Sequence, residues 1–347
     1  MRIGAIPENP VEWLALQTNR MPVPLVHTQI HFVLSRAVLE AYSLGVFEAF
    51  ADGSRTLQQC ARNTGLDQRA LRSLLNVLIA AGYLTFSRGR YQLTKLSKKW
   101  CLRSSPDSLY DQQIFNKVCW EWMDHMEGFL KSGRGLQFHE TFTPKQWELY
   151  QNGMENVARS SAQNAIRMLP RLNQPERFLD IGGSHGIYSA GLVNKYPTAE
   201  ATILELPQAV RAARRILKKH YTGKAVRHQP GNVLTDPLEE EKYDLILMSS
   251  LMHHFTEKQN MEVSRKVARA LKKGGYFVIQ EFLRPETSPG MDMIGTVLDL
   301  YFNLSSTSGN WSASELIRFQ EKSGLKHIRI NKFISPPGYT QVIAKKT

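Results

Sequence analysis

Short apolar segments alternate with amphipathic helical patterns in the second half of the chain. The apolar segments of strand length after Gln174 cover residues 177–181, 201–205, 225–228, 243–248 and 275–280. Strands that alternate with helices in this way are typical of a doubly wound α/β fold with a parallel sheet. The end of the chain differs, because segments 326–333 and 340–345 are separated only by a short turn, which predicts an antiparallel hairpin.

The N-terminal part of the chain shows helical periodicity. Apolar positions recur every three or four residues in segment 27–50, which predicts a buried helix that ends near Gly45. Two shorter helices are expected at 56–64 and 67–81, and residues 83–94 alternate around a glycine turn, which predicts a hairpin. Two helices followed by a hairpin predict a winged-helix domain, so this part is expected to be mainly helical.

A winged helix in a basic chain is compatible with two partners, DNA or a second copy of the chain. The net charge is +13, and Arg69 and Arg72 stand near the start of the helix expected at 67–81, where they could contact DNA. The same helix is dense in leucine, as at Leu71 and Leu75, and keeps few polar positions for base edges. We therefore expect a homodimer through this domain, with a ligand-sensing DNA-binding regulator as the alternative.

Helical patterns rich in aromatic and methionine side chains connect the two halves. Met154 is one of these methionines. Such side chains usually pack between helices, and beside a cofactor site they can also wall an apolar pocket. We expect three segments in all: a winged-helix dimerisation domain at 1–105, a helical connector and pocket wall at 106–172, and the α/β domain at 173–347.

Composition excludes several classes of protein. Hydrophobic residues make up 42% and charged residues 22% of the chain, which is typical of a soluble globular protein. The chain has no apolar run long enough to cross a membrane, and its first residues lack an apolar signal core, so a cytoplasmic location is expected. The cysteines, Cys60, Cys101 and Cys119, form no C-x-x-C pair, so neither a disulfide framework nor a metal site is predicted.

The segment FLDIGGSHGIYS, residues 178–189, indicates a buried strand that breaks into a glycine turn and then a helix. Gly182, Gly183 and Gly186 allow a ligand to approach the main chain, but their spacing does not match the G-x-G-x-x-G pattern of dinucleotide sites. Glu205 ends the next apolar segment, 23 residues after Gly182. A carboxylate at that distance suits the hydroxyls of a ribose, so a nucleoside-type cofactor is expected.

This combination of a D-x-G-G-x-x-G loop, an acid after the second strand and a closing hairpin resembles the class I S-adenosylmethionine-dependent methyltransferases. The N-terminal winged helix makes the whole chain similar to the small-molecule O-methyltransferase family that includes caffeate, acetylserotonin and hydroxyneurosporene methyltransferases. The resemblance implies a Rossmann-like sheet, S-adenosylmethionine as cofactor with S-adenosylhomocysteine as product, no metal, a small-molecule acceptor and an intertwined homodimer.

The resemblance also implies which residues bind the cofactor. Asp180, Gly182 and Gly183 of the glycine loop would lie along the methionine part of the cofactor, and Glu205 would hold the ribose. Gly186 and Leu206 are also expected to bind the cofactor. Asn232 and Val233 would lie near the adenine, Ser249 stands where the family has lysine, and Phe255 stands where it has a tryptophan near the adenine.

A histidine pair follows the fourth predicted strand of the sheet, in the sequence SSLMHHFTEKQ. In the family this position carries the catalytic base, which corresponds to His253 here, and His254 stands where the family has aspartate. Imidazole is suited to accept a hydroxyl proton near neutral pH. Glu281 matches a carboxylate that orients the histidine, whereas the second such acid of the family is replaced by Asn310.

The acceptor is not identified by the sequence. Candidates for its pocket are Met154, Met291, Ile294, Leu298, Phe302 and Asn303, which could equally pack a helix. Because the second acid is missing, methyl transfer to sulfur, nitrogen or carbon without a base remains open, and so does a relative of the fold that no longer transfers methyl groups.

Overall fold

The computed structural model describes residues 4–287, 292–334 and 338–347, and the chain folds as two compact units that divide between Val118 and Cys119. The finer division into three segments at residues 105 and 172 stays a prediction. Among the described residues, no helix combines the length and apolar character that a membrane crossing requires.

The N-terminal unit is mainly helical, as expected. Its helices are α1 (Pro10–Gln17), α2 (Val23–Leu25), the π-helical turn Val26–Ile30, α3 (His31–Ser43), the 3₁₀ turn Glu48–Phe50, α4 (Leu57–Thr64), α5 (Gln68–Ala80) and α6 (Lys95–Trp100). Strands β1 (Leu84–Ser87) and β2 (Arg90–Leu93) form the predicted hairpin, and α7 (Tyr110–Trp122) follows.

Local sequence explains why α4 and α5 are separate helices. Thr56 and Gln59 form a capping box at the start of α4, and Gly65 ends that helix at φ +72°. Asp67 then caps α5, because its side chain accepts a hydrogen bond from the backbone N–H of Ala70 at 2.9 Å.

Two expectations about this unit are corrected. The leucine-rich face of α5 does not serve as a free interface, because Leu71, Leu75 and Leu78 are buried in the core of the unit. The helix predicted as buried is buried only in its second half: Leu39 and Ala41 lie in the core, whereas Val33 is 52% exposed. Helical spacing of apolar residues identifies a face that needs covering but not which surface covers it.

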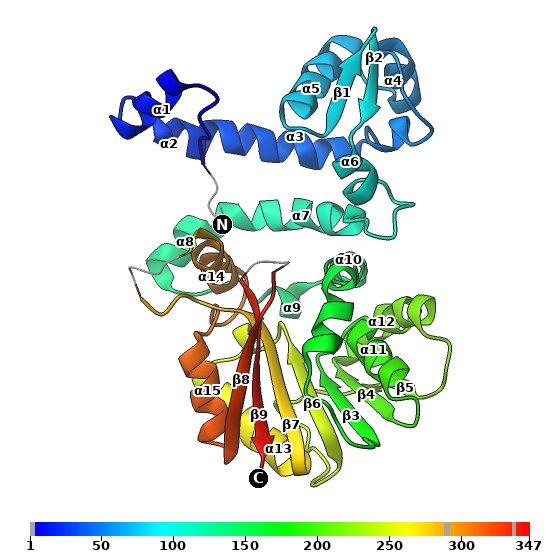
Figure 1. Cartoon of the computed structure of the whole chain (residues 1–347), viewed down its shortest axis with the longest axis vertical. Coiled ribbons are helices and arrows are strands. Elements are labelled where there is room, and N and C mark those ends of the chain that lie inside the picture. Colours follow the sequence, from blue (N-terminus) through cyan, green and yellow to red (C-terminus); the bar gives the residue numbers. More distant parts are fainter. Residues whose placement is uncertain (1–3, 288–291, 335–337) are drawn as a thin grey trace. The chain divides into compact units, whose positions relative to one another are not determined.

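The C-terminal unit holds a seven-stranded sheet of order β5-β4-β3-β6-β7-β9-β8 (Figure 1). Its strands are β3 (Arg177–Ile181), β4 (Glu200–Glu205), β5 (Val226–Pro230), β6 (Tyr243–Ser249), β7 (Leu271–Phe282), β8 (Leu325–Lys332) and β9 (Tyr339–Lys346). Neighbouring strands from β5 through β4, β3 and β6 to β7 pair in parallel. Strand β9 pairs antiparallel with both β7 and β8. The predicted doubly wound sheet with a closing hairpin is therefore confirmed.

Helices cover both faces of this sheet. They are α10 (Pro144–Met168), α11 (Ile187–Lys195), α12 (Pro207–His220), α13 (Glu257–Ala270) and α15 (Ala313–Glu321). The unit also contains α8 (Met126–Ser132), α9 (Phe138–Thr141), α14 (Met293–Ser305) and the 3₁₀ turns Met123–His125 and Met252–His254. Side chains alternate between two cores along a strand: Leu245 and Leu247 pack with α10 and α11, whereas Ile246 and Met248 pack with α13 and α15. A continuous apolar run in the sequence therefore forms a strand that is buried on both faces.

Candidate active site

The turn after β3 needs glycine for two different reasons. Gly182 has φ +68°, a conformation that side chains disfavour. At Gly183, an added Cβ would lie 2.4 Å from the carboxyl carbon of Asp180, so the turn and the carboxyl group share one space. The backbone N–H of Gly182 donates to Leu204 O at 2.8 Å, which ties the turn to β4.

Asp180 lies beneath this turn and is buried, with 1% of its surface exposed. Ser189 Oγ donates to its Oδ2 at 2.8 Å, and Oδ1 has no hydrogen-bond partner among the described residues. Burial raises the pKa of Asp180 to about 7. Asp180 therefore supports the turn from below.

Glu205 closes β4 and accepts hydrogen bonds at both carboxylate oxygens. The backbone N–H groups of Ser184 and Leu206 donate to Oε2 and Oε1 at 2.9 and 2.8 Å. Burial raises the pKa of Glu205 to about 7, although these two hydrogen bonds act in the opposite direction. Its carboxylate is thus held in one orientation at the edge of a cavity.

This cavity has a volume of about 330 Å³ and lies at the carboxyl ends of β3, β4 and β6. Such an edge of an open parallel sheet is the usual place for a ligand. Six of the predicted cofactor residues line it, namely Gly182, Glu205, Leu206, Asn232, Val233 and Phe255. The sequence therefore predicted most of the sheet side of the cavity.

The remaining predicted cofactor residues lie elsewhere. Gly183 and Ser249 line a neighbouring cavity of about 90 Å³, which also includes Met154. Asp180 lies below the turn, and Gly186 caps the start of α11 at φ +73°. The two cavities share lining residues, so they belong to one site.

The polar groups of two predicted residues already have protein partners. Asn232 Oδ1 accepts from the backbone N–H of Leu234 at 3.0 Å. Ser249 Oγ lies 2.9 Å from the hydroxyl of Tyr339 and accepts from Gln280 Nε2 at 3.1 Å. Both side chains are therefore oriented before any ligand binds.

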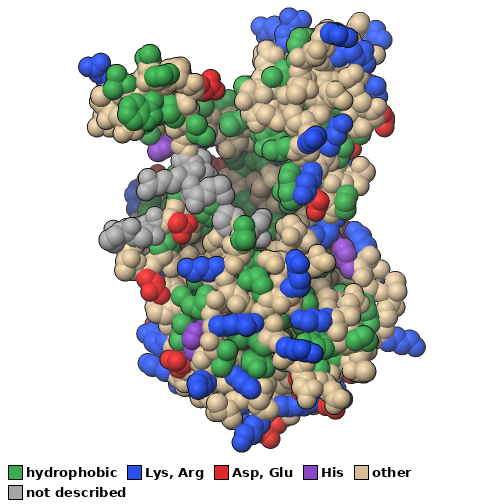
Figure 2. All heavy atoms as spheres, viewed as in Figure 1, with side chains coloured by type: hydrophobic (Ala, Val, Ile, Leu, Met, Phe, Trp, Pro, Cys, Tyr) green, Lys and Arg blue, Asp and Glu red, His purple; other side chains and the backbone are tan. Residues whose placement is uncertain are grey.

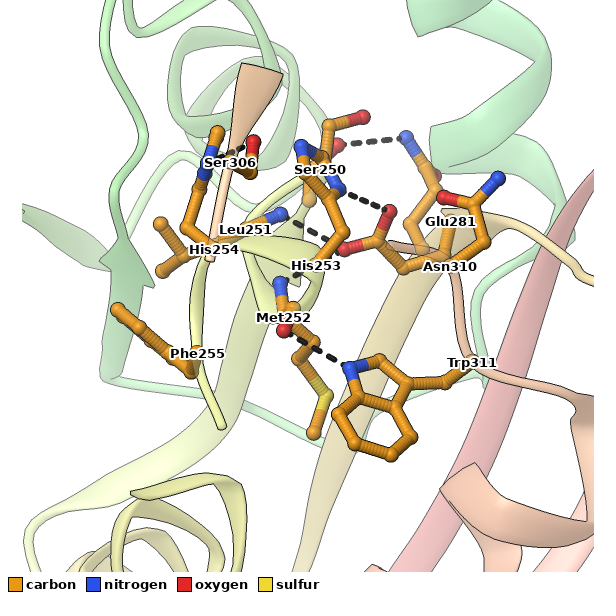
Figure 3. A network of polar contacts seen from close by, with 12 residues as sticks. Ser250, Leu251, Met252, His253, His254, Phe255, Glu281, Ser306, Asn310 and Trp311 are labelled. Carbon is orange, nitrogen blue, oxygen red and sulfur yellow. Dashed lines mark hydrogen bonds and ion pairs between the residues drawn. The ribbon is translucent and has the colours of Figure 1, made fainter. Parts of the chain in front are cut away.

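His253 and Glu281 form a buried pair where β6 and β7 end (Figure 3). His253 Nδ1 lies 3.1 Å from Glu281 Oε2. The other oxygen, Oε1, accepts from the backbone N–H groups of Leu251 and Met252 at 2.7 and 2.8 Å. Because a carboxylate only accepts, Nδ1 of His253 carries a hydrogen, and in the neutral imidazole Nε2 then has the lone pair.

His253 does not line the cavity. It is 2% exposed, and the rings of Phe302 and His254 lie 4.0 and 4.1 Å from its own, measured between ring centroids. His254 lines the cavity in its place, and its Nδ1 lies 2.8 Å from Ser306 Oγ. The histidine with the carboxylate partner and the histidine that faces the cavity are therefore different residues.

Asn310 stands where the sequence lacks a second acid. Its backbone N–H donates to Asp299 Oδ1 at 2.8 Å, and its carbonyl accepts from Arg284 Nε at 3.2 Å. Its side chain is buried, and neither amide atom has a hydrogen-bond partner among the described residues. Trp311, the next residue, donates from Nε1 to Met252 O at 2.9 Å, which fixes this segment against the turn that holds His253 (Figure 3).

The predicted acceptor residues on α14 are not in the wall of the large cavity. Phe302 packs on His253, and Asn303 Nδ2 donates to Asp299 O at 2.9 Å within α14. Ile294 and Leu298 are half-buried on the same helix, and Met291 lies outside the described residues. The role of these residues stays a prediction.

The sequence predicted a pocket wall in segment 106–172 but did not single out His139. His139 from α9 lines the cavity with the rings of Phe138, Trp147 and Tyr150, and we call this group of side chains the aromatic wall. The aromatic content of this stretch was visible in the sequence, but which rings face a cavity depends on the four-residue helix α9 and the loops around it. Such short helices leave no periodic signal.

Burial also sets the charge of this wall. It lowers the pKa of His139 to about 3 and the pKa of His254 well below its ordinary value, and the nearby His253 acts in the same direction on both. Both imidazoles are therefore neutral at physiological pH. Among the described residues, no group of three or more His, Cys, Asp or Glu side chains is placed to hold a metal ion.

Comparison with known proteins identifies the family. A family model described as the O-methyltransferase domain matches residues 111–325, and one described as the O-methyltransferase dimerisation domain matches residues 26–103. The chain is 24% identical over 323 residues to the 3-hydroxy-5-methyl-1-naphthoate 3-O-methyltransferase of Streptomyces sahachiroi, which covers 89% of this chain and 91% of the relative.

Two further matches extend this comparison. The chain is 24% identical over 293 residues to the L-tyrosine C(3)-methyltransferase of Streptomyces lavendulae, which covers 79% of each. The solved structure of human N-acetylserotonin methyltransferase in complex with SAM matches with a TM-score of 0.81 at 18% identity and covers 99% of each chain. The domain model alone matches more than half of the chain, so the chain belongs to the S-adenosylmethionine-dependent O-methyltransferase family.

Proposed function

We propose that this enzyme transfers a methyl group from S-adenosylmethionine to a hydroxyl group of a small molecule, with His253 as the general base. The observation that carries the proposal is the buried contact between His253 Nδ1 and Glu281 Oε2 at 3.1 Å. It supports a fixed tautomer in which Nε2 can accept a proton.

The site residues fit the cofactor of the family. The turn at Gly182 exposes main chain to the cavity without a Cβ, and Glu205 offers an oriented carboxylate for two ribose hydroxyls. Asn232, Val233 and Phe255 would form the adenine side. When bound, the cofactor supplies a methyl group on a positively charged sulfur, which needs no acid to leave.

His253 acts on the acceptor in this proposal. Its Nε2 would take the proton of the acceptor hydroxyl and hold it until it passes to water. Glu281 stabilises the imidazolium that forms, because its carboxylate already holds Nδ1. Phe302 and His254 cover His253, so they have to shift when the acceptor binds.

Replacement of His253 tests this proposal. We expect His253→Ala to lower kcat by roughly 10²- to 10⁴-fold on a phenol, because the proton then has no acceptor within reach. The affinity for S-adenosylhomocysteine, measured by calorimetry, should not change. His125→Ala is the matched control, since His125 is exposed and does not line the cavity.

A second candidate is methyl transfer to carbon by proximity and orientation alone. Two observations favour it. The rings of Phe302 and His254 cover His253, and Asn310 carries an amide where the family has an acid. A His253→Ala variant that kept full kcat and a rate that did not change with pH would select this alternative over the O-methyltransferase proposal.

We also propose that the enzyme is a cytoplasmic homodimer that binds no nucleic acid. The dimerisation-domain model over residues 26–103 supports the dimer. The three cysteines, Cys60, Cys101 and Cys119, are buried free thiols, which agrees with a reducing compartment. The burial of Leu71 and Leu75 leaves α5 as a packed helix of a winged-helix domain.

A further inference from the structure

Ser184 has a backbone conformation that its side chain disfavours. It directly follows two glycines in the turn after β3, and its own φ is +48°, in the left-handed region that favours glycine. A residue with a side chain keeps such a conformation only where its surroundings hold it there, and residues of this kind gather at functional sites. Ser184 lines both cavities of the candidate active site, so the contacts that hold it bear on the site.

Three elements hold Ser184, each at a different atom. Its backbone N–H donates to Glu205 Oε2 at the end of β4, at 2.9 Å. Its carbonyl oxygen lies 2.8 Å from His228 Nε2 on β5, and its Oγ donates to Gln151 Oε1 on α10. Because a carbonyl oxygen only accepts, Nε2 of His228 carries a hydrogen and donates it. Gln151 and His228 thus hold the residue whose N–H contacts Glu205.

Both of these partners lie in the interior of the unit. Gln151 is 1% exposed and His228 is 8% exposed. Burial lowers the pKa of His228, although the hydrogen bond to Ser184 acts in the opposite direction, so its ring is neutral at physiological pH. A buried polar group that loses its partner is unfavourable. Each contact therefore resists a change in the conformation of Ser184.

The N–H of Ser184 affects both the place and the charge of Glu205. Together with the N–H of Leu206, it orients the carboxylate at the edge of the cavity. Burial raises the pKa of Glu205 to about 7, and these two hydrogen bonds act against that rise because they favour the ionised form. If Ser184 left its left-handed conformation, its N–H would turn away from Glu205. The carboxylate would then be less firmly oriented and harder to ionise.

We propose that Gln151 and His228 are positioning residues for cofactor binding, which act through Ser184 to hold the carboxylate of Glu205 in place for the ribose. This inference rests on the proposed role of Glu205 at the ribose. His228 lines neither of the two cavities, so it acts on the cofactor through its neighbours.

Removal of each contact tests the proposal. The dissociation constant of S-adenosylhomocysteine is measured by calorimetry for the full chain and for its variants Gln151→Leu and His228→Leu. We expect each variant to bind roughly three- to tenfold more weakly, the range for the net loss of one hydrogen bond. His228→Gln should regain much of the affinity, because the glutamine amide can still donate to the carbonyl of Ser184. Gln229→Leu is the matched control, since Gln229 is the exposed neighbour of His228 on β5.

The pH dependence of this affinity separates positioning from a loss of folding. Without the hydrogen bond from Ser184 the pKa of Glu205 rises further, so a higher pH is needed to ionise it. We expect the pH of half-maximal affinity to move upwards in His228→Leu, whereas a partly unfolded variant would lose affinity equally at every pH. Asp180 and Tyr150 also interact electrostatically with Glu205, and both are unchanged in this variant.

Ser184→Gly tests the route through Ser184. Glycine adopts a positive φ readily and keeps both backbone groups, so a turn with glycine here does not depend on the contact with Gln151. We expect Gln151→Leu to weaken binding of S-adenosylhomocysteine in the wild-type chain and to have little effect in Ser184→Gly. Equal losses in both backgrounds would show that Gln151 does not act through Ser184 and would overturn the proposal.

The same measurements separate this inference from the proposed function. Absence of S-adenosylhomocysteine binding by the wild-type chain would contradict the methyltransferase proposal. Wild-type affinity in Glu205→Gln at pH 8 would contradict the ribose role of Glu205 and, with it, this inference. Weaker binding in Glu205→Gln, together with wild-type affinity and an unchanged pH profile in Gln151→Leu and His228→Leu, would contradict the inference alone.

Discussion

Glu281 links the backbone and the base of the site through a single carboxylate. One oxygen accepts from the N–H groups of Leu251 and Met252, and the other holds Nδ1 of His253. The same side chain therefore shapes the turn after β6 and sets the tautomer of the histidine. Its replacement should act on position and protonation, since Glu281 itself does not line the cavity.

Glu281→Gln tests this role, because it keeps the shape of the side chain but turns one acceptor into a donor. The amide can then satisfy either the backbone N–H groups or Nδ1–H, but not both. We expect kcat to fall by less than the roughly 10²-fold minimum for loss of a base. In ¹⁵N NMR spectra, His253 should lose its fixed Nδ1–H tautomer, whereas an unchanged tautomer would show that Glu281 does not orient the ring.

Glu205 predicts a pH dependence of cofactor affinity. Its pKa is raised to about 7 by burial, so much of it is protonated below that pH and ionised above it. Ribose hydroxyls donate to the ionised form, so binding at low pH requires the loss of a proton. We expect the affinity for S-adenosylhomocysteine to be about tenfold lower at pH 6 than at pH 8 and to level off at higher pH.

Glu205→Gln should flatten this profile, because the amide does not titrate. Burial also raises the pKa of Asp180 to about 7. The negative charge of Asp180 in turn raises the pKa of Glu205. Asp180→Asn is therefore the matched variant. A pH dependence that persists in Glu205→Gln and vanishes in Asp180→Asn would assign the effect to Asp180 instead.

The strand, turn and helix around the glycine loop could be predicted from local sequence. A strand that ends at Ile181, directly after Asp180, and is followed by glycines and a helix was recognisable because each residue type has a local reason to be there. The contact of His253 with Glu281 was also predictable, because His253 follows β6, Glu281 lies at the end of β7, and the carboxyl ends of these parallel strands share one edge. Parallel pairing converts a separation in sequence into proximity.

Two features could not be predicted from local sequence, namely which rings line the cavity and which surface covers the apolar face of α5. His139 reaches the cavity through a four-residue helix, and neighbours far apart in the sequence decide which way its ring points. For α5, helical spacing of leucines predicted an apolar face correctly, but the core of its own unit covers that face. Local patterns identify faces, and tertiary packing decides their partners.

Gly183→Ala tests the loop as an element. An added Cβ would meet the Asp180 carboxyl group at 2.4 Å, so the turn or the carboxyl group has to move. We expect a lower melting temperature and an affinity for S-adenosylhomocysteine at least about tenfold weaker, the latter corresponding to roughly 1.4 kcal/mol. Gly128→Ala is the matched control, because nothing lies within 4 Å of its Cβ position in α8.

At the scale of the whole molecule, the N-terminal unit has an apolar surface that its own core does not cover. Figure 2 shows hydrophobic side chains gathered on the surface over α1 and α2. Among the most exposed large apolar side chains are Val11, Leu14 and Leu25 on these helices, with Ile30 and Val33 at the start of α3. Contiguous exposed apolar surface is typical of an interface.

We therefore expect the dimer to form through the surface at Ile30 and Val33, which are 57% and 52% exposed and lie within the dimerisation-domain match. An obligate interface usually buries roughly 2,000 Å² or more, so the wild-type chain should sediment as a dimer at micromolar concentration. Charges at this surface, introduced together as Ile30→Asp and Val33→Asp, should yield a monomer, because two unpaired carboxylates would have to be buried in each copy. Leu130→Asp is the control, since Leu130 is 68% exposed on α8 and lies outside that match.

Two outcomes would contradict this expectation. A wild-type chain that sediments as a monomer with full activity would contradict the dimer, and a double variant that stays dimeric would show that the interface does not include Ile30 and Val33.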